Sequence, residues 1–175
     1  MAKSARPYRR SIWNTDPRYE LDYSSLTEAD VKTISKLAWV DAAKKNAPPI
    51  AAKSLLQISK AAKAIPSPKD VKAKEIEQYL QGGLDHLGAG IPTLICMLAV
   101  ESNGDYPPID RKFAAGMKRG KKISANEVGH LVAKDIVKFA KVYVEKVIPA
   151  WRESRKGRSP EQADNFWGRG GRDDS

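Results

Sequence analysis

The run LICMLAVES, residues 94–102, limits the possible folds more than any other part of the chain. If this run is helical, apolar side chains cover nearly its whole circumference, so it has to pass through a core that other helices surround. No segment alternates apolar and polar residues convincingly, as a half-buried strand would. The sequence therefore predicts an all-α fold, a compact helical bundle around this run.

Amphipathic patterns and breaking residues predict the surrounding helices. Apolar stripes at helical spacing indicate helices at 26–46 and 50–65. A third helix is expected to begin with Ser67 as its cap and Pro68 as its first residue, and the glycine pair at 82–83 is expected to end it.

The second half of the chain predicts one long helix and a tail. Ser124 and Glu127 form a capping box, and the apolar pattern behind them continues for about six turns, until Pro149. The last residues are charged and rich in glycine, so partial disorder is expected there, although Phe166 and Trp167 could dock on the body. The predicted organisation is a basic aromatic arm at 1–25, a helical domain at 26–151 and a tail at 152–175.

The charge balance indicates the kind of partner. Lys and Arg number 31 against 21 Asp and Glu, which gives a formal net charge of +10. Double-stranded DNA is the first candidate partner, and a protein that is basic by chance is the alternative. The single cysteine, Cys96, excludes an internal disulfide. The chain has only two histidines, His86 and His130, so no metal centre is expected. No stretch resembles a secretory signal or a membrane span, so a cytoplasmic location is expected.

The sequence HLGAGIPTLICMLAV predicts a helix end, a Gly-x-Gly turn and a second helix with Pro92 in its first turn. Glycines allow unusual backbone angles and close approach of a ligand. The free amides and the dipole of the new helix favour an anion, so this turn is a candidate grip for a DNA phosphate. An ordinary helix–helix turn is the alternative. The residues expected to contact DNA here are Gly88, Ala89, Gly90, Ile91 and Thr93.

The stretch NGDYPPIDRKFAAGM places Asp110 at the start of a short helix, twenty positions after Gly90. Basic residues follow it and are expected to lie near the aspartate and to neutralise phosphates. A solvated surface loop explains each of them singly as well. These candidate DNA contacts are Arg111, Lys112, Lys118, Arg119, Lys121 and Lys122.

The two motifs together resemble the helix-hairpin-helix DNA glycosylases, the superfamily that includes endonuclease III and the adenine glycosylases. In that family a Gly-h-Gly-x-x-Thr-Ala hairpin and an apolar helix precede a proline-containing turn with a catalytic aspartate at the same distance. The segment GAGIPTL matches the hairpin at Gly88, Gly90 and Thr93, and YPPID matches the turn and Asp110. The resemblance covers residues 84–118, about a fifth of the chain.

Departures from the family pattern refine what the resemblance implies. Leu87 stands where the family often has proline, Leu94 where it often has alanine, and His86 where an apolar residue is usual. Members that also cut the strand carry a lysine two places after the second glycine, and here that place is Pro92. The family's four-cysteine cluster cannot form either. The resemblance therefore implies a monofunctional enzyme without β-lyase activity, and it permits a monovalent cation on the hairpin carbonyls.

The expected function is excision of a damaged or modified base from duplex DNA, as in base excision repair. Asp110 is the expected catalytic residue, since a carboxylate stabilises an oxocarbenium-like sugar or activates a water; its alternative role is an N-cap. The competing hypotheses are a non-catalytic helix-hairpin-helix protein that grips the DNA backbone and a basic RNA-binding or assembly factor. The excised base, the opposite base and the oligomeric state stay open. Aromatic candidates for stacking on a flipped base, each better explained by a core position, are Trp39, Tyr79, Tyr106 and Phe113.

Overall fold

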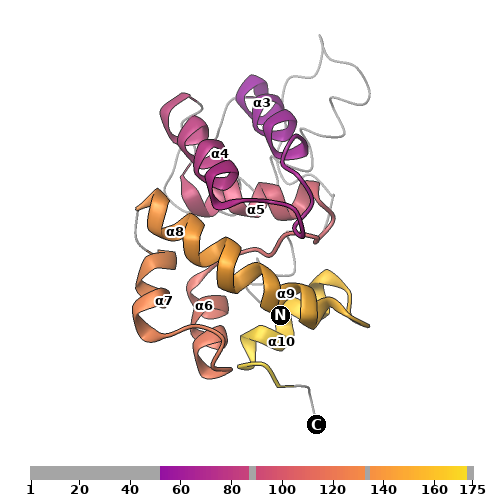
Figure 1. The fold of residues 1–175 in the computed structure, drawn as a ribbon. Coiled ribbons are helices and arrows are strands. Elements are labelled where there is room, and N and C mark those ends of the chain that lie inside the picture. Colours follow the sequence, from indigo (N-terminus) through magenta and orange to yellow (C-terminus); the bar gives the residue numbers. More distant parts are fainter. Residues whose placement is uncertain (1–51, 87–89, 133–134, 173–175) are drawn as a thin grey trace, which may run out of the picture.

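The computed structural model describes residues 52–86, 90–132 and 135–172, and every regular element in these ranges is a helix (Figure 1). The predicted all-α class is therefore confirmed for the described part of the chain. The basic arm at 1–25 and the helix predicted at 26–46 lie outside the described residues.

Helix α5 (Ile91–Glu101) runs through the core, as its apolar sequence predicts. Helices α3 (Ala52–Lys63) and α4 (Ala73–His86) both pack against it (Figure 1). Helix α3 confirms a helix over 52–63 of the range 50–65 that the sequence predicts. The α5 side chains that are at most 1% exposed include Leu94, Ile95, Met97 and Leu98.

A buried carboxylate fixes α3 against α5. The side chain of Glu101, at the end of α5, is 1% exposed. It accepts a hydrogen bond from the Ser59 hydroxyl, and its Oε2 lies 3.4 Å from Nζ of Lys63. Because a buried charge is costly without such partners, this contact is specific for one arrangement of the two helices.

Helix α4 begins later than the sequence predicted. The Ser67 carbonyl accepts the Asp70 amide at 2.9 Å, so the residues expected to open the helix form a turn instead. The helix begins at Ala73, and the Glu75 carboxylate in its first turn accepts the amide of the preceding residue, Lys72, at 2.9 Å. The Ser67 hydroxyl bonds the Asp70 carboxylate within the turn, whereas the Glu75 carboxylate makes the bond to the residue before the helix that is typical of a helix start.

The glycine pair Gly82 and Gly83 does not end α4, which continues to His86. A Cβ atom added at Gly83 would lie 2.5 Å from both Cδ atoms of Leu94, closer than real Cβ contacts allow. The glycine is therefore explained by the close crossing of α4 over α5. A Cβ atom added at Gly82 would meet nothing within 4 Å.

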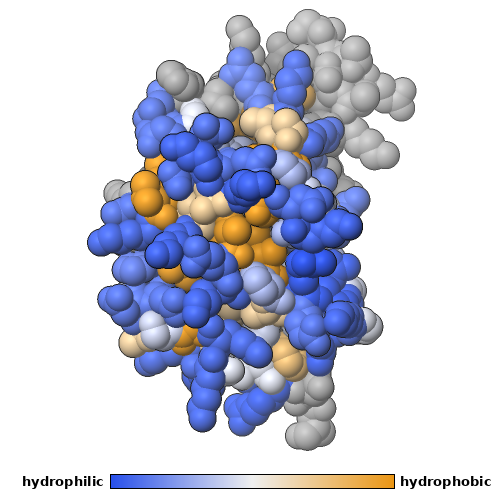
Figure 2. Space-filling view, in the orientation of Figure 1, coloured by the Kyte–Doolittle hydropathy of each residue, from blue (hydrophilic) through white to orange (hydrophobic). Residues whose placement is uncertain are grey.

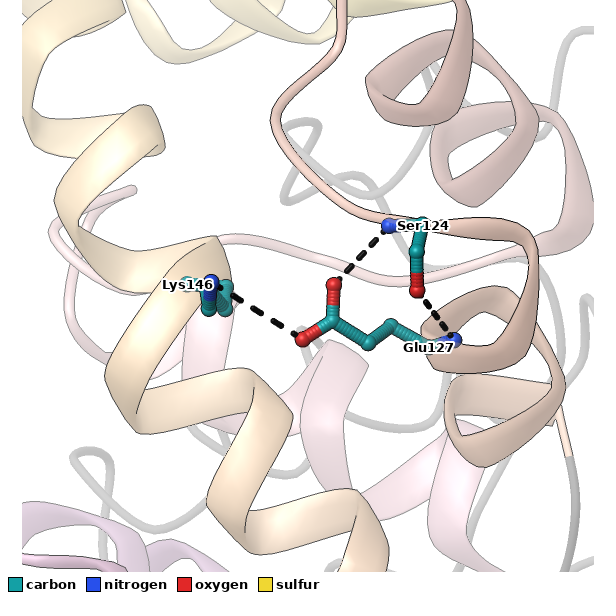
Figure 3. A network of polar contacts seen from close by, with 3 residues as sticks. All are labelled: Ser124, Glu127 and Lys146. Atoms are coloured by element: carbon teal, nitrogen blue, oxygen red, sulfur yellow. Dashed lines mark hydrogen bonds and ion pairs between the residues drawn. The ribbon is translucent and has the colours of Figure 1, made fainter.

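Helix α6 (Arg111–Arg119) and helix α7 (Ala125–Val132) lie side by side. The predicted capping box at the start of α7 is confirmed. The Ser124 hydroxyl accepts the Glu127 amide at 3.1 Å, and the Glu127 carboxylate accepts the Ser124 amide at 2.8 Å (Figure 3). This start is determined by residues three positions apart, which is why the sequence alone predicts it.

The single long helix predicted after this capping box was wrong, because the chain breaks into separate helices. Helix α7 ends at Val132, and helix α8 (Ile136–Val142) begins after Asp135. The Asp135 carboxylate accepts the Lys138 amide at 3.1 Å and so caps the new helix. Helix α8 then packs along α4 (Figure 1).

The path of α8 continues through a π-helical turn, η2 (Tyr143–Val147), into α9 (Ile148–Arg155). In this turn the Ile148 amide donates to the Tyr143 carbonyl, five residues back. Pro149 was predicted to end the helix, but it occupies the first turn of α9. The missing amide of the proline falls directly after the π-helical turn, where the pattern of backbone hydrogen bonds changes.

Helix α10 (Pro160–Gly168) forms within the segment expected to be partly disordered, and that expectation was wrong for these residues. Ser159 and Gln162 make a full capping box at its start. The expected docking of Trp167 is confirmed. Its side chain is 3% exposed, and its Nε1 donates to the Ser154 hydroxyl at 2.9 Å.

Buried aromatic side chains join the helices into one core. The Tyr143 hydroxyl donates to the Pro107 carbonyl at 2.7 Å, and Trp151 Nε1 donates to the Gly104 carbonyl at 2.8 Å. Figure 2 shows a largely hydrophilic face with an apolar area near its centre, in the region between α5 and α8. Among the described residues, no helix has the length and apolar character that crossing a membrane requires.

Candidate nucleic-acid interface

Asp110 is the N-cap of α6, as the sequence predicted. Its backbone is extended, with φ −139° and ψ 179°, and its Oδ1 accepts the Phe113 amide at 2.8 Å. The side chain of Phe113 is fully buried, which ties the first turn of α6 to the core. Asp110 itself is only half-buried, so its carboxylate lies at the boundary between the core and the surface.

The turn before Asp110 is firmly built. Asn103 and Gly104 reverse the chain after α5 with φ values of 54° and 83°. The segment Tyr106–Ile109 is buried, and its Pro107 carbonyl accepts the Tyr143 hydroxyl. The segment that precedes the aspartate is therefore packed into the core. This restricts movement of the Asp110 backbone, as a functional side chain in a fixed position requires.

The first turn of α5 is the described part of the predicted hairpin, since Gly88 and Ala89 lie outside the described residues. Pro92 lies in this turn, as predicted. The side chains of Ile91 and Thr93 are 6% and 5% exposed. Any anion here would therefore meet their backbone amides rather than their side chains.

The expectation that the hairpin glycines need unusual backbone angles was wrong for Gly90. It is the N-cap of α5 with φ −83° and ψ 164°, which any residue can adopt. A Cβ atom added here would have only Pro92 Cδ nearby, at 3.8 Å. Backbone freedom therefore does not explain this glycine, and its effect is to leave the helix start uncovered.

The six predicted cations of α6 and the loop behind it are all exposed. Two of them, Arg111 and Lys112, lie in the first turn, where a positive charge opposes the helix dipole and is unfavourable for the helix itself. Together with the dipole they raise the positive potential beside Asp110. Among the described residues, no ion pair neutralises either of them.

The basic loop is not beside the aspartate, contrary to the sequence prediction. Lys118 and Arg119 lie in the last turn of α6, and Lys121 and Lys122 follow it. A helix of this length separates the two ends by about 13 Å along its axis. The structure therefore divides the predicted cations into a pair next to Asp110 and a cluster at the far end of α6.

The loop behind α6 is anchored where it leads into α7. Ile123 is buried, and the capping box of α7 follows it. Glu127 Oε2 also lies 4.0 Å from Nζ of Lys146 in η2, so the box links α7 to the opposite helix (Figure 3). The Ser124 amide, which donates to the Glu127 carboxylate, holds the pKa of that group below its ordinary value.

Three of the aromatic candidates for base stacking belong to the core. Tyr79 is 7% exposed, Tyr106 2% and Phe113 0%. Burial raises the pKa values of both tyrosines above the ordinary value, and the hydroxyl of Tyr79 donates to the Leu94 carbonyl. None of the three presents a face to a flipped base. Trp39 lies outside the described residues.

An open hollow was not anticipated from the sequence. It measures about 340 Å³, and none of the predicted site residues lines it. Arg155 is fixed at its rim, because its Nη1 donates to the Gly104 carbonyl at 2.8 Å and its Nε to the Arg158 carbonyl at 3.1 Å. The residues around the hollow are Ser67, Pro68, Lys69, Asp105, Trp151, Arg152 and Arg155.

No group of three or more His, Cys, Asp or Glu side chains that could hold a metal ion occurs within the described ranges. Comparisons with models of protein families, with curated proteins and with solved structures found no match.

Proposed function

We propose that this protein is a monofunctional DNA N-glycosylase in which Asp110 is the catalytic carboxylate. The observation that carries the proposal is the position of Asp110. It is half-buried at the start of α6, on a buried Tyr–Pro–Pro–Ile segment, with two exposed cations directly behind it. The resemblance of residues 84–118 to the helix-hairpin-helix glycosylases supports the same assignment.

The proposed reaction is hydrolysis of the bond between a base and its deoxyribose. The target nucleotide leaves the stack, at a cost of about a few kcal/mol. As the bond breaks, its electron pair leaves with the base, and the carboxylate of Asp110 stabilises the positive sugar. Asp110 then accepts a proton from the water whose oxygen bonds to the sugar carbon, and it passes this proton to solvent. The departing base takes up one proton from solvent, so the net reaction consumes one water and returns the carboxylate to its ionised form.

The hydrogen bond from the Phe113 amide is compatible with this role. The capping bond occupies one of the roughly four acceptor sites of an ionised carboxylate. The bond also restricts rotation of the side chain, which favours one productive orientation. In this proposal, the exposed side chains of Arg111 and Lys112 contact phosphates near the extruded nucleotide.

The same capping bond favours a second candidate function. An aspartate at this place stabilises α6 without any chemistry. In that case the exposed cations and the start of α5 would hold duplex DNA, and the protein would be a non-catalytic DNA-binding module. The two candidates differ in base release and agree in salt-sensitive DNA binding.

A base-release assay separates these candidates. The duplexes would contain 8-oxoguanine, adenine opposite 8-oxoguanine, uracil, thymine opposite guanine, hypoxanthine or alkylated purines. The variant is Asp110→Asn, and the control is Asp105→Asn, which removes an exposed carboxylate from the preceding turn. We expect alkali-dependent strand breaks with the wild type and the control, and none with Asp110→Asn.

Equal release by Asp110→Asn would remove the catalytic assignment. Salt-sensitive binding of the wild type without release from any duplex would favour the non-catalytic module. Absence of duplex binding at about 0.1 M salt would contradict both candidates, because each requires contacts with DNA phosphates.

A further inference from the structure

The end of α10 and the end of α6 are packed so closely that they form one surface (Figure 1). A Cβ atom added at Gly116 of α6 would lie 1.6 Å from the Trp167 carbonyl oxygen. One added at Gly120 would lie 2.9 Å from the Trp167 ring and 3.1 Å from the Gly170 carbonyl oxygen. Glycines at these two places are what allow the backbones to meet.

Arg119 joins the two segments. Its Nη2 donates to the Gly168 carbonyl at 3.0 Å. A Cβ atom added at Gly170 would lie 3.1 Å from Arg119 Nε and 3.2 Å from its Cβ, so the arginine stem passes directly beside the chain after α10. Residues far apart in the sequence therefore bring their charges together.

The combined basic surface contains six cations and, within 116–123 and 166–172, no carboxylate. The two aspartates that follow it, Asp173 and Asp174, lie outside the described residues. The large apolar side chains that are exposed in the described part of the chain, Leu84, Val132 and Val137, belong to other elements. The members of the combined basic surface are Lys118, Arg119, Lys121, Lys122, Arg169 and Arg172.

The turn that carries the last two arginines is held by bonds from their side chains to its backbone carbonyls. Arg169 Nε donates to the Arg172 carbonyl and Arg172 Nε to the Arg169 carbonyl, each at 3.2 Å. Gly170 and Gly171 between them have φ values of 74° and 79°. The bond made by Arg172 uses only one of its five N–H donors, so the fork of its guanidinium can still bind a phosphate.

We propose that Gly168–Arg172 and the far end of α6 form a single phosphate-binding surface for the backbone of duplex DNA. The inference rests on the DNA binding in the proposed function and extends it to a segment that the sequence marked as a tail. An extended array of cations without exposed apolar side chains matches a row of phosphates. Protein partners, in contrast, usually bind through apolar and aromatic centres.

Equilibrium binding of the full chain to a fluorescent DNA duplex, over a range of salt concentrations, tests the inference. The variant is Arg172→Ala. The control is Arg152→Ala, which removes the same charge from an exposed position on α9. Loss of one phosphate contact should lower the slope of log affinity against log salt by about 0.9 and weaken binding roughly eightfold at 0.1 M salt. The control should leave the slope unchanged.

Further variants separate the possible failures. Arg172→Lys keeps the charge and should retain most of the wild-type slope, whereas a purely structural role of the arginine would not be rescued. If Lys121→Ala weakens binding but Arg172→Ala behaves like Arg152→Ala, the carboxy-terminal part of the surface is refuted while DNA binding stands. If the wild type does not bind the duplex, both this inference and the proposed function fall.

Discussion

Asp110 has a structural role that is independent of any chemistry, and the two roles can be measured separately. Asparagine can accept the Phe113 amide through its own side-chain oxygen, so Asp110→Asn should retain the cap. Asp110→Ala should lose about 1 kcal/mol of unfolding free energy, or roughly 2–4 °C in Tm. Thermal unfolding of the two variants checks this. An alanine variant as stable as the asparagine variant would show that the bond contributes nothing.

Glu127 gives α7 a pH-dependent stability. The Ser124 amide, and to a smaller extent the nearby Lys146, lower the pKa of its carboxyl group from the ordinary value of 4.5. A pKa lowered by folding adds stability above the unfolded value, and this contribution is lost as the pH falls through the folded pKa.

The matched variant is Glu127→Gln, because glutamine keeps the acceptor for the Ser124 amide and removes only the charge. We expect the wild type to be more stable than the variant at pH 7, and the difference to be lost as the pH falls from 4.5 through the lowered pKa of the Glu127 carboxyl group. Urea unfolding at several pH values measures it. A difference that grows towards acid would contradict the assignment.

At the scale of elements, the crossing of α4 over α5 is the contact most sensitive to small changes. Gly83→Ala would push a methyl group into Leu94 and should cost about 1–3 kcal/mol. Gly82→Ala is the matched control, since it meets nothing within 4 Å and should stabilise the helix by about 0.5–1 kcal/mol. Opposite signs in chemical unfolding are expected, and equal effects would exclude the crossing as the cause.

These glycines also show where sequence patterns lose information. The caps at Asp110 and Ser124 depend on residues three positions away, so they could be predicted. Gly83 depends on Leu94, a contact between two helices that no local pattern contains. A glycine that ends a helix and a glycine that lets two helices touch have the same letter, and only the packing distinguishes them.

At the scale of the whole molecule, α10 completes the core. Trp151 Nε1 donates to the Gly104 carbonyl in the turn after α5, and Trp167 Nε1 donates to the Ser154 hydroxyl on α9. Trp167→Ala should cost about 3–5 kcal/mol of unfolding free energy, because it leaves a cavity and removes the buried hydrogen bond that Nε1 donates to the Ser154 hydroxyl.

Phe166→Ala is the control for this prediction. Phe166 is only partly buried, with the Arg158 guanidinium 4.0 Å from its ring centre, and its loss should cost less. Chemical unfolding of both variants, followed by the helical signal in far-ultraviolet circular dichroism, checks which variant loses more unfolding free energy. Equal costs would mean that α10 rests on the surface rather than in the core.

The candidate site was predicted only as far as local signals extend. The position of Asp110 at a helix start follows from the residues around it, and this was confirmed. The separation of the basic loop from Asp110 depends on the length of α6, and the addition of Arg169 and Arg172 depends on the docking of α10. Both depend on how the helices pack in the folded chain, and composition and charge alone do not predict that packing.

The π-helical turn η2 has a consequence for how chains of this kind can vary in length. A turn closed over five residues holds one more residue than an α-helical turn needs. Loss of one residue within Tyr143–Val147 would restore regular winding and leave the flanking side chains facing as they do now. The same loss in the middle of α4 would rotate everything beyond it by about 100° and turn its core residues outward. In an alignment of related chains, a one-residue gap within Tyr143–Val147 would therefore be compatible with the same fold. A one-residue gap elsewhere in a helix would instead suggest an alignment error.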